Sequence, residues 1–187
     1  MTRLFIDTHS ELVMMAIVDE KRVYKKEAIS NRSHSEVAIP LLDELLKSSG
    51  IGLAEIDEII VVNGPGSFTG VRIGVTIAKT IAYSNNIDIK TITSLEMYGV
   101  SAKEYFDIVM VPDSKGVYSA HLVDGKYVEF MYQRQADFDE YISKNGFTIL
   151  EGKNVDFEKI IAYSKGLKKV NPHKVNPIYI KEIDALK

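Results

Sequence analysis

The stretch that decides the fold is NGPGSFTGVRIG, residues 63–74. It follows an apolar run, Ile56–Val62, that is typical of a buried central strand. The Gly-Pro-Gly at residues 64–66 predicts a tight turn, because glycine reaches positive φ at no steric cost. Ser67 is then a suitable N-cap. The stretch therefore predicts a strand, a glycine turn and a helix over residues 67–83.

The glycine spacing excludes two familiar phosphate-binding motifs. A P-loop requires a lysine directly after its last glycine, and none follows here. The Rossmann pattern requires two residues between its last two glycines, whereas Gly66 and Gly70 are separated by three. The amides that begin the predicted helix remain able to bind an anion, as they are in any helix.

Small residues recur every four positions along the predicted helix: Gly70, Gly74, Ala78 and Ala82. They form one flat ridge, because residues four apart share a helix face. A glycine inside a helix costs roughly 1 kcal/mol relative to alanine, so we expect another backbone to approach the ridge closely. Two interpretations stay open. The ridge packs on its own sheet or on the helix predicted over 33–46, or it meets a helix of another chain.

The elements around this stretch predict a mixed sheet covered by helices, in the order β-β-β-α-β-α-β-α. Ser33 and Glu36 fit a capping box at the start of a helix that Gly50 ends. Pro40 lies inside that helix and should kink it. The expected strands are Leu4–Asp7, Leu12–Val18, Lys21–Ile29, Ile56–Val62 and Asp88–Ile92, and a further helix is expected over Ser94–Tyr105.

The second half of the chain opens like the first, with a strand, an acid and a hairpin. Asp124-Gly125 is the strongest short hairpin signal in the chain. We therefore predict two related lobes with mixed sheets, residues 1–105 and a truncated second lobe over 106–187. Expected elements of the second lobe are strands at Asp107–Val111, Gly116–Val123, Lys126–Tyr132 and Phe147–Leu150, and helices at Asp137–Lys144 and Asp156–Tyr163.

Composition limits the possible functions. The 187 residues carry a net charge of −3 and no cysteine, which excludes disulfides, thiolate catalysis and cysteine-ligated zinc. Without a basic excess, we expect nucleic acid to be handled through a partner. The cluster Lys165, Lys168, Lys169, His173 and Lys174 is either a solvated face or a contact for nucleic-acid phosphates. No apolar stretch is long enough to span a membrane, so we expect a cytoplasmic protein without membrane partners.

Several segments together resemble the bacterial TsaB (YeaZ) family. The signature is Gly-Pro-Gly-Ser-Phe-Thr-Gly-Val-Arg-Ile-Gly at 64–74. Segments that agree with it are Leu4–Thr8, Arg32–Glu36, Thr93-Ser94-Leu95, Pro112–Tyr118 and Pro177–Ile180. The chain departs from the family pattern at Lys115, where an arginine is expected, and its second half is shorter than is typical.

The resemblance implies an α/β actin-like ATPase (ribonuclease H-like) fold. It also implies a non-catalytic subunit that binds and stabilises TsaD, the transferase that makes N6-threonylcarbamoyladenosine at adenosine 37 of tRNA. Partners would be a TsaD-like transferase and a TsaE-like ATPase, with a homodimer when the chain is alone and tRNA reached only through the complex. No cofactor is expected for the isolated chain, because ATP and metal would belong to the partner subunits.

The residues are consistent with a subunit that has no catalytic activity. Metal binding of the TsaD type needs two histidines four apart on a helix, and no two of His9, His34, His121 and His173 have that spacing. We therefore predict no metal site. Asp7 and Asp113 end corresponding strands; they either hold Mg²⁺ beside a nucleotide or accept hydrogen bonds from nearby amides.

We expect the helices predicted over 33–46 and 67–83 to form a four-helix contact with the equivalent pair of TsaD or of a second copy. We expect Arg72 to pair with an acid of the first lobe or with TsaD, or to be a solvated surface residue. The rival hypotheses are a small actin-like ATPase or kinase, and a homodimeric scaffold without a tRNA role. The expected partner-binding residues are Ser33, His34, Glu36, Ala38, Leu41, Gly66, Ser67, Phe68, Thr69, Gly70, Arg72, Gly74, Ala78 and Ala82.

Overall fold

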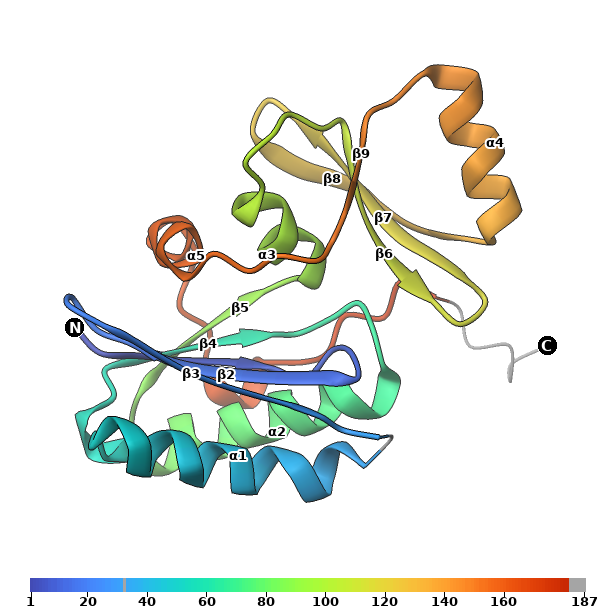
Figure 1. Ribbon diagram of the computed structural model, residues 1–187. Helices are drawn as coiled ribbons and strands as arrows, with labels where there is room; N and C mark the ends of the chain where they lie inside the picture. Colours follow the sequence, from blue (N-terminus) through green and yellow to red (C-terminus); the bar gives the residue numbers. More distant parts are fainter. Residues whose placement is uncertain (32, 182–187) are drawn as a thin grey trace.

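The structure is a computed structural model that describes residues 1–31 and 33–181. It contains two β-sheets that follow one another along the chain, with helices packed on their faces (Figure 1). The strand order is β3-β2-β1-β4-β5 in the first sheet and β8-β7-β6-β9 in the second. Arg32, which begins one of the segments that resemble the family, and residues 182–187, the end of the predicted second lobe, lie outside the described residues.

The first sheet is mixed: β1 pairs antiparallel with β2 and parallel with β4. Because parallel neighbours need a crossover, α1 connects β3 to β4, and α2 connects β4 to β5. The elements of this lobe are β1 (Arg3–Asp7), β2 (Leu12–Val18), β3 (Val23–Ile29), α1 (His34–Ser49), a 3₁₀ turn η1 (Leu53–Glu55), β4 (Glu58–Val62), α2 (Phe68–Asn85), β5 (Asp88–Ile92) and α3 (Ser94–Ser101).

Strand alternation decides which side chains cover which face of the first sheet. In β1, Leu4 and Ile6 belong to the core beneath α1 and α2, whereas Phe5 belongs to the core beneath α3 and α5 (Phe157–Ser164). Figure 1 shows α1 and α2 side by side on one face and α3 and α5 on the other. The sheet therefore covers only the inner side of α1 and α2, and Ile39, Thr76 and Thr80 on their other side are exposed.

The second sheet repeats the topology of the first. Its elements are β6 (Ile108–Asp113), β7 (Gly116–Val123), β8 (Lys126–Gln133), α4 (Gln135–Asn145) and β9 (Ile149–Glu151). β6 pairs antiparallel with β7 and parallel with β9, just as β1 pairs with β2 and β4. Within the described ranges no strand corresponds to β5. The prediction of two related lobes with a truncated second one is confirmed.

The predicted lobe boundary needs one correction. The sequence assigned all of 106–187 to the second lobe, but the chain from α5 onward packs on the first sheet. Ile160 is buried against its α3 face, Val170 bridges to Ile89 at the free edge of β5, and Val175 is buried beneath α2. Residues from α5 onward cover apolar surface of the first sheet, and their burial there is favourable. This segment therefore belongs structurally to the first lobe as well as to the second.

The helix ends also differ in detail from the predictions. Ser33 makes no capping bond with its side chain, so the capping box predicted with Glu36 is wrong. A capping box forms instead between Thr93 and Glu96, at the start of α3. Gly50 ends α1 in the left-handed conformation, as predicted. α3 stops at Ser101, short of the predicted Tyr105, because Ala102 turns extended.

None of the helices formed by residues 1–31 and 33–181 is both long and apolar enough to cross a bilayer.

Candidate functional site

The glycine–alanine ridge of α2 faces its own chain. A Cβ atom at Gly70 would collide with the carbonyl oxygen of Thr8, and one at Gly74 with the Thr8 hydroxyl group. That hydroxyl donates to the Gly70 carbonyl at 2.7 Å, and Ala78 and Ala82 are fully buried. The first of the two interpretations is therefore correct: the ridge lets the loop after β1 and the sheet approach α2 closely.

This result corrects the expected partner-binding set. The four ridge residues are covered by the protein itself, and so are Ala38 and Leu41 on α1. They stabilise the lobe and are not available to a partner. The remaining expected residues, apart from the buried His34, lie at or near the surface at the helix starts: Ser33, Glu36, Gly66, Ser67, Phe68, Thr69 and Arg72.

The exposed residues of these helices lie on the opposite side from the ridge. We call this surface the outer α1–α2 face and define it by Ile39, Asp43, Thr69, Thr76 and Thr80. Ile39 is 55% exposed although it is aliphatic. Four of these residues were not among those predicted from the sequence: Ile39, Asp43, Thr76 and Thr80. The available signal was Ile39, an apolar residue outside the buried stripe of α1.

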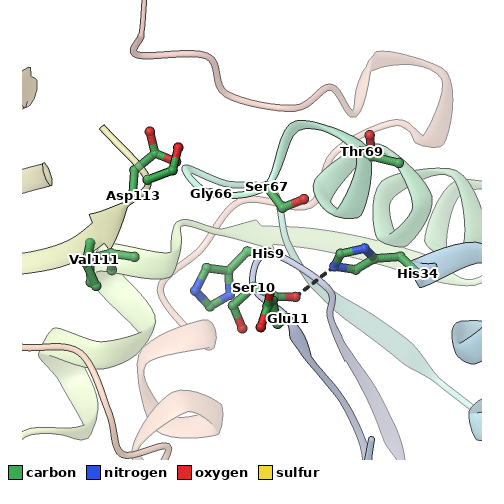
Figure 2. A pocket seen from close by; sticks show the side chains of 11 residues that line it. His9, Ser10, Glu11, His34, Gly66, Ser67, Thr69, Val111 and Asp113 are labelled. Carbon is green, nitrogen blue, oxygen red and sulfur yellow. Dashed lines mark hydrogen bonds between the residues drawn. The ribbon is translucent and has the colours of Figure 1, made fainter. Parts of the chain in front are cut away.

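A cleft of about 540 Å³ lies between the lobes (Figure 2). The loop after β1, the starts of α1 and α2, and the end of β6 meet there. Figure 2 shows Asp113 and Val111 of the second lobe facing Ser67 and His34 of the first. The cleft is lined by His9, Ser10, Glu11, His34, Gly66, Ser67, Thr69, Val111, Pro112, Asp113 and Ser114.

His34 has a structural role at this cleft. It is 5% exposed, and its Nε2 lies 2.8 Å from the carbonyl oxygen of Ser10. Because a carbonyl only accepts, Nε2 must carry the proton and donate it. The bond ties the start of α1 to the loop after β1 (Figure 2). His34 thus makes a contact inside the chain, and the expectation that it touches a partner stays a prediction.

Asp7 is enclosed by its own loop. It is 2% exposed, and its Oδ1 accepts from the His9 amide at 3.0 Å and from His9 Nδ1 at 2.7 Å. His9 Nε2 is buried and has no hydrogen-bond partner among the described residues. Of the two interpretations of Asp7, the hydrogen-bonded one describes the structure.

Asp113 is occupied by a lysine from the end of the chain. Its Oδ2 accepts from Lys181 Nζ at 2.9 Å and from the Tyr132 hydroxyl at 3.0 Å. Partial burial alone would raise the pKa of Asp113, but the hydrogen bonds from Lys181 and Tyr132 outweigh it and lower that pKa. The ammonium group of Lys181 thus lies beside the Asp113 carboxylate. A metal-binding site would need further oxygen ligands at this place.

Lys181 reaches Asp113 because residues 175–181 cross from one lobe to the other. We call this segment the C-terminal strap. The amide of Ile178 donates to the Asn63 carbonyl at 2.7 Å, directly after β4. Arg72 Nε donates to the Tyr179 hydroxyl at 2.7 Å, and its guanidinium lies 3.7 Å from the centre of the Phe68 ring. Arg72 was expected to pair with an acid of the first lobe or with TsaD; among the described residues it bonds the strap, and its contact with TsaD stays a prediction.

The Asp113 contact makes a pH-dependent contribution to stability. The folded-state pKa lies below the ordinary value of 3.8, so the contribution is fully present above about pH 4 and is lost as the pH falls through the folded-state pKa. We expect Asp113→Asn to lower the free energy of unfolding at pH 7 and to have progressively less effect below pH 4. Urea unfolding of both proteins across this range tests it. A difference that does not depend on pH would contradict the assignment.

Neither of the two described loops that follow β1 and β6 is a glycine-rich phosphate-binding loop of the actin type. The loop between β1 and β2, Thr8–Glu11, contains no glycine, and β6 and β7 are joined by only two residues, Ser114-Lys115. Backbone amides need such glycines to approach phosphates closely. In the part of the chain that the structure describes, no three of the side chains that bind metals gather into one group.

The fold and the cleft define the class of protein: two lobes of the actin-like ATPase fold around a central cleft. A family model described as TsaD, tRNA N6-adenosine threonylcarbamoyltransferase, matches residues 24–170. The TsaB protein of Bacillus subtilis is 37% identical over 113 residues, and that of Haemophilus influenzae is 33% identical over 104. The structure of YeaZ from Pseudomonas aeruginosa superposes with a TM-score of 0.77 at 19% identity, over 95% of this chain and 99% of that one.

The chain therefore belongs to this family and, within it, to the TsaB (YeaZ) group. The matched segments cover 60% and 56% of this chain and 49% and 44% of the two TsaB proteins. The chain thus spans about half the length of the curated relatives it matches.

Proposed function

We propose that this protein acts in tRNA threonylcarbamoyladenosine synthesis as a non-catalytic subunit that binds and stabilises a TsaD-like transferase. The observation that carries the proposal is that the two acids at the ends of corresponding strands are bonded to the protein's own side chains, Asp7 to His9 and Asp113 to Lys181. Relatives named as TsaB biosynthesis proteins support the pathway. This chain has the fold of a transferase, but its Asp7 and Asp113 carboxylates are bonded to its own side chains. Such a chain is suited to binding a partner rather than to catalysing a reaction.

The outer α1–α2 face is the proposed contact surface. It is formed by two neighbouring helices, and the sheet covers only their inner side. A TsaD-like chain shares this fold, so it presents an equivalent pair of helices. Two such pairs can pack as four helices, because ridges of one helix fit grooves of another at a few preferred angles. A second copy of this chain would offer the same pair, which accounts for a homodimer when the transferase is absent.

The other components keep the chemistry in this proposal. ATP and metal are bound by the transferase and by a TsaE-like ATPase, and the latter joins the pair after it has formed. The rival function is nucleotide binding by this chain in the cleft. The cleft has room for a ligand and lies at the start of α2, but the missing glycine loops and the capture of Asp113 by Lys181 disfavour phosphate and metal binding there.

Charged substitutions on the outer α1–α2 face are expected to abolish binding to the transferase. In Ile39→Arg and Thr76→Arg, the arginine remains solvated in the free protein and would be buried without a partner in the complex. We expect the Kd for the separately purified TsaD-like chain to rise at least about 100-fold, which corresponds to roughly 2.7 kcal/mol. Isothermal titration calorimetry measures it, and thermal melting of each variant should stay close to that of the unmodified chain.

The control is Glu140→Arg on α4, an equally exposed helix position in the second lobe. It should leave the Kd unchanged. Full-strength binding by both Ile39→Arg and Thr76→Arg would exclude the outer α1–α2 face as the contact surface. Full tRNA modification by the transferase and its other partners without this chain would overturn the proposed function as a whole.

A further inference from the structure

The last part of the chain has an unusual distribution of charge. Between Lys159 and Lys181 the sequence contains no acidic residue, although the whole protein has a net charge of −3. The six lysines of this segment are Lys159, Lys165, Lys168, Lys169, Lys174 and Lys181. Positive charge is therefore concentrated in a segment that packs along the first lobe, on a protein that is acidic elsewhere.

Three of these lysines have partners within the chain. Lys159 Nζ donates to the Ala102 carbonyl at 2.6 Å, Lys169 pairs with Asp88, and Lys181 pairs with Asp113. The other three are exposed and form no ion pair with any acid in the described ranges: Lys165, Lys168 and Lys174. Their charges are not neutralised by the fold.

His173 of the basic segment packs against Tyr83 of α2 at the surface. Val170 donates its amide to the Ile89 carbonyl at 2.8 Å, which carries the chain past the free edge of β5 and onto α2. There His173, in the 3₁₀ turn η2 (Pro172–Lys174), meets Tyr83 edge to face, with ring centres 4.8 Å apart. Tyr83 is 67% exposed, so most of its ring is open to solvent.

A hollow of about 420 Å³ lies beside this pair. Asn86 and Asn171 contribute amide groups to it, and the charge of Asp88 is matched there by Lys169. Lys79 Nζ lies 3.5 Å from the carbonyl oxygen of His173, which connects η2 to α2 next to the hollow. The hollow thus combines an open aromatic ring with asparagine side chains. The exposed Lys174 follows His173 directly in η2, and Lys165 and Lys168 lie earlier in the same basic segment.

We propose that this surface binds single-stranded RNA, with a base stacked on Tyr83 in the hollow and phosphates bound by Lys165, Lys168 and Lys174. We call it the Tyr83–His173 surface. Aromatic rings stack on any base, and unpaired lysines release counterions from phosphates. An acidic protein segment would use the lysines but not the open ring, and a membrane would require apolar residues where the hollow has Asn86 and Asn171. Identifying the RNA as tRNA rests on the proposed function.

The test measures binding of a fluorescent single-stranded RNA oligonucleotide by anisotropy, at 50 to 200 mM salt. The variant Lys165→Glu/Lys168→Glu/Lys174→Glu should weaken binding at least about tenfold. It should also reduce the salt slope of log K by about 2, since each phosphate contact on a single strand contributes roughly 0.7. Tyr83→Ala should weaken binding about tenfold and leave the salt slope unchanged, because stacking releases few ions.

The matched control is Lys126→Glu/Lys144→Glu/Lys153→Glu, three exposed lysines of the second lobe that give the same net charge. It should keep the RNA affinity within about twofold. Three outcomes would overturn the proposal: an equal loss in the control, no saturable RNA binding by the unmodified chain, or equally tight binding to phosphatidylserine vesicles that Tyr83→Ala leaves intact. The Ile39→Arg variant should still bind RNA, although it should no longer bind the transferase. This variant therefore distinguishes failure of the proposed transferase contact from failure of the proposed RNA site.

Discussion

Replacing Ala78 by arginine is expected to unfold the first lobe, whereas Thr76→Arg, two residues earlier on α2, should leave it folded. Ala78 is fully buried in the core formed by the first sheet, α1 and α2. Its position offers no space for a longer side chain and no acid of this core to pair with. A buried charge without a partner costs roughly 3–5 kcal/mol, which is a large part of the stability of a typical domain. Thr76 faces solvent.

Urea unfolding followed by circular dichroism measures both variants. We expect the midpoint of Ala78→Arg to fall sharply or the transition to be lost, and that of Thr76→Arg to stay near the unmodified value. The opposite pattern, a stable Ala78→Arg protein that no longer binds the transferase, would show that the ridge is a contact surface for other chains. The pair of variants therefore separates folding from binding on one helix.

Glu58→Gln is expected to be the most destabilising change that conserves side-chain size. Glu58 is 1% exposed, and it lies between two cations. Its Oε1 is 3.2 Å from Arg3 Nε, and its Oε2 is 2.9 Å from Lys90 Nζ. Lys90 also donates to the Ser164 carbonyl at 2.8 Å, which joins β4 and β5 to the end of α5.

Removing the carboxylate leaves the Lys90 ammonium buried without a counter-charge, so we expect a loss of roughly 3–5 kcal/mol in the free energy of unfolding. The double variant Glu58→Met/Lys90→Met should recover much of it, because apolar side chains of similar size can replace a buried ion pair. The control is Asp43→Asn at the exposed pair with Lys47, where the loss should be below about 1 kcal/mol. A loss for Glu58→Gln as small as that of the control would contradict this account.

The elements with strong local signals were predicted well. The strands Asp88–Ile92 and Gly116–Val123 have the bounds that the sequence predicted. The turn at Asp124-Gly125 and the stop at Gly50 formed as expected, since both have positive φ, which glycine adopts easily. The capping box at Ser33 failed because the same four-residue pattern does not fix the backbone angles of the first residue.

The sequence predicted which segments form the candidate site, but it did not predict which face of each helix is exposed. Small residues four apart look the same whether a helix packs on its own sheet or on another chain, and only the loop after β1 decided between them. The pairing of Asp113 with Lys181 joins residues 68 positions apart. The contact of Arg72 with Tyr179 spans 107 positions. No local pattern encodes either contact.

The sequence by itself determined the order of strands and helices, the repeat of the first lobe in the second, and membership of the TsaB (YeaZ) group. The order and the repeat follow from periodicities and turn residues that act within one or two helical turns of the chain. The family follows from the resemblance of the motif at residues 64–74, and of the segments that agree with it, to the TsaB (YeaZ) pattern. Only the tertiary structure decided which face of α2 is buried, which groups surround Asp7 and Asp113, and that η2 brings His173 to Tyr83 on the first lobe. Those properties depend on how distant segments meet, because burial and charge pairing are set by neighbours in space and not by neighbours in sequence.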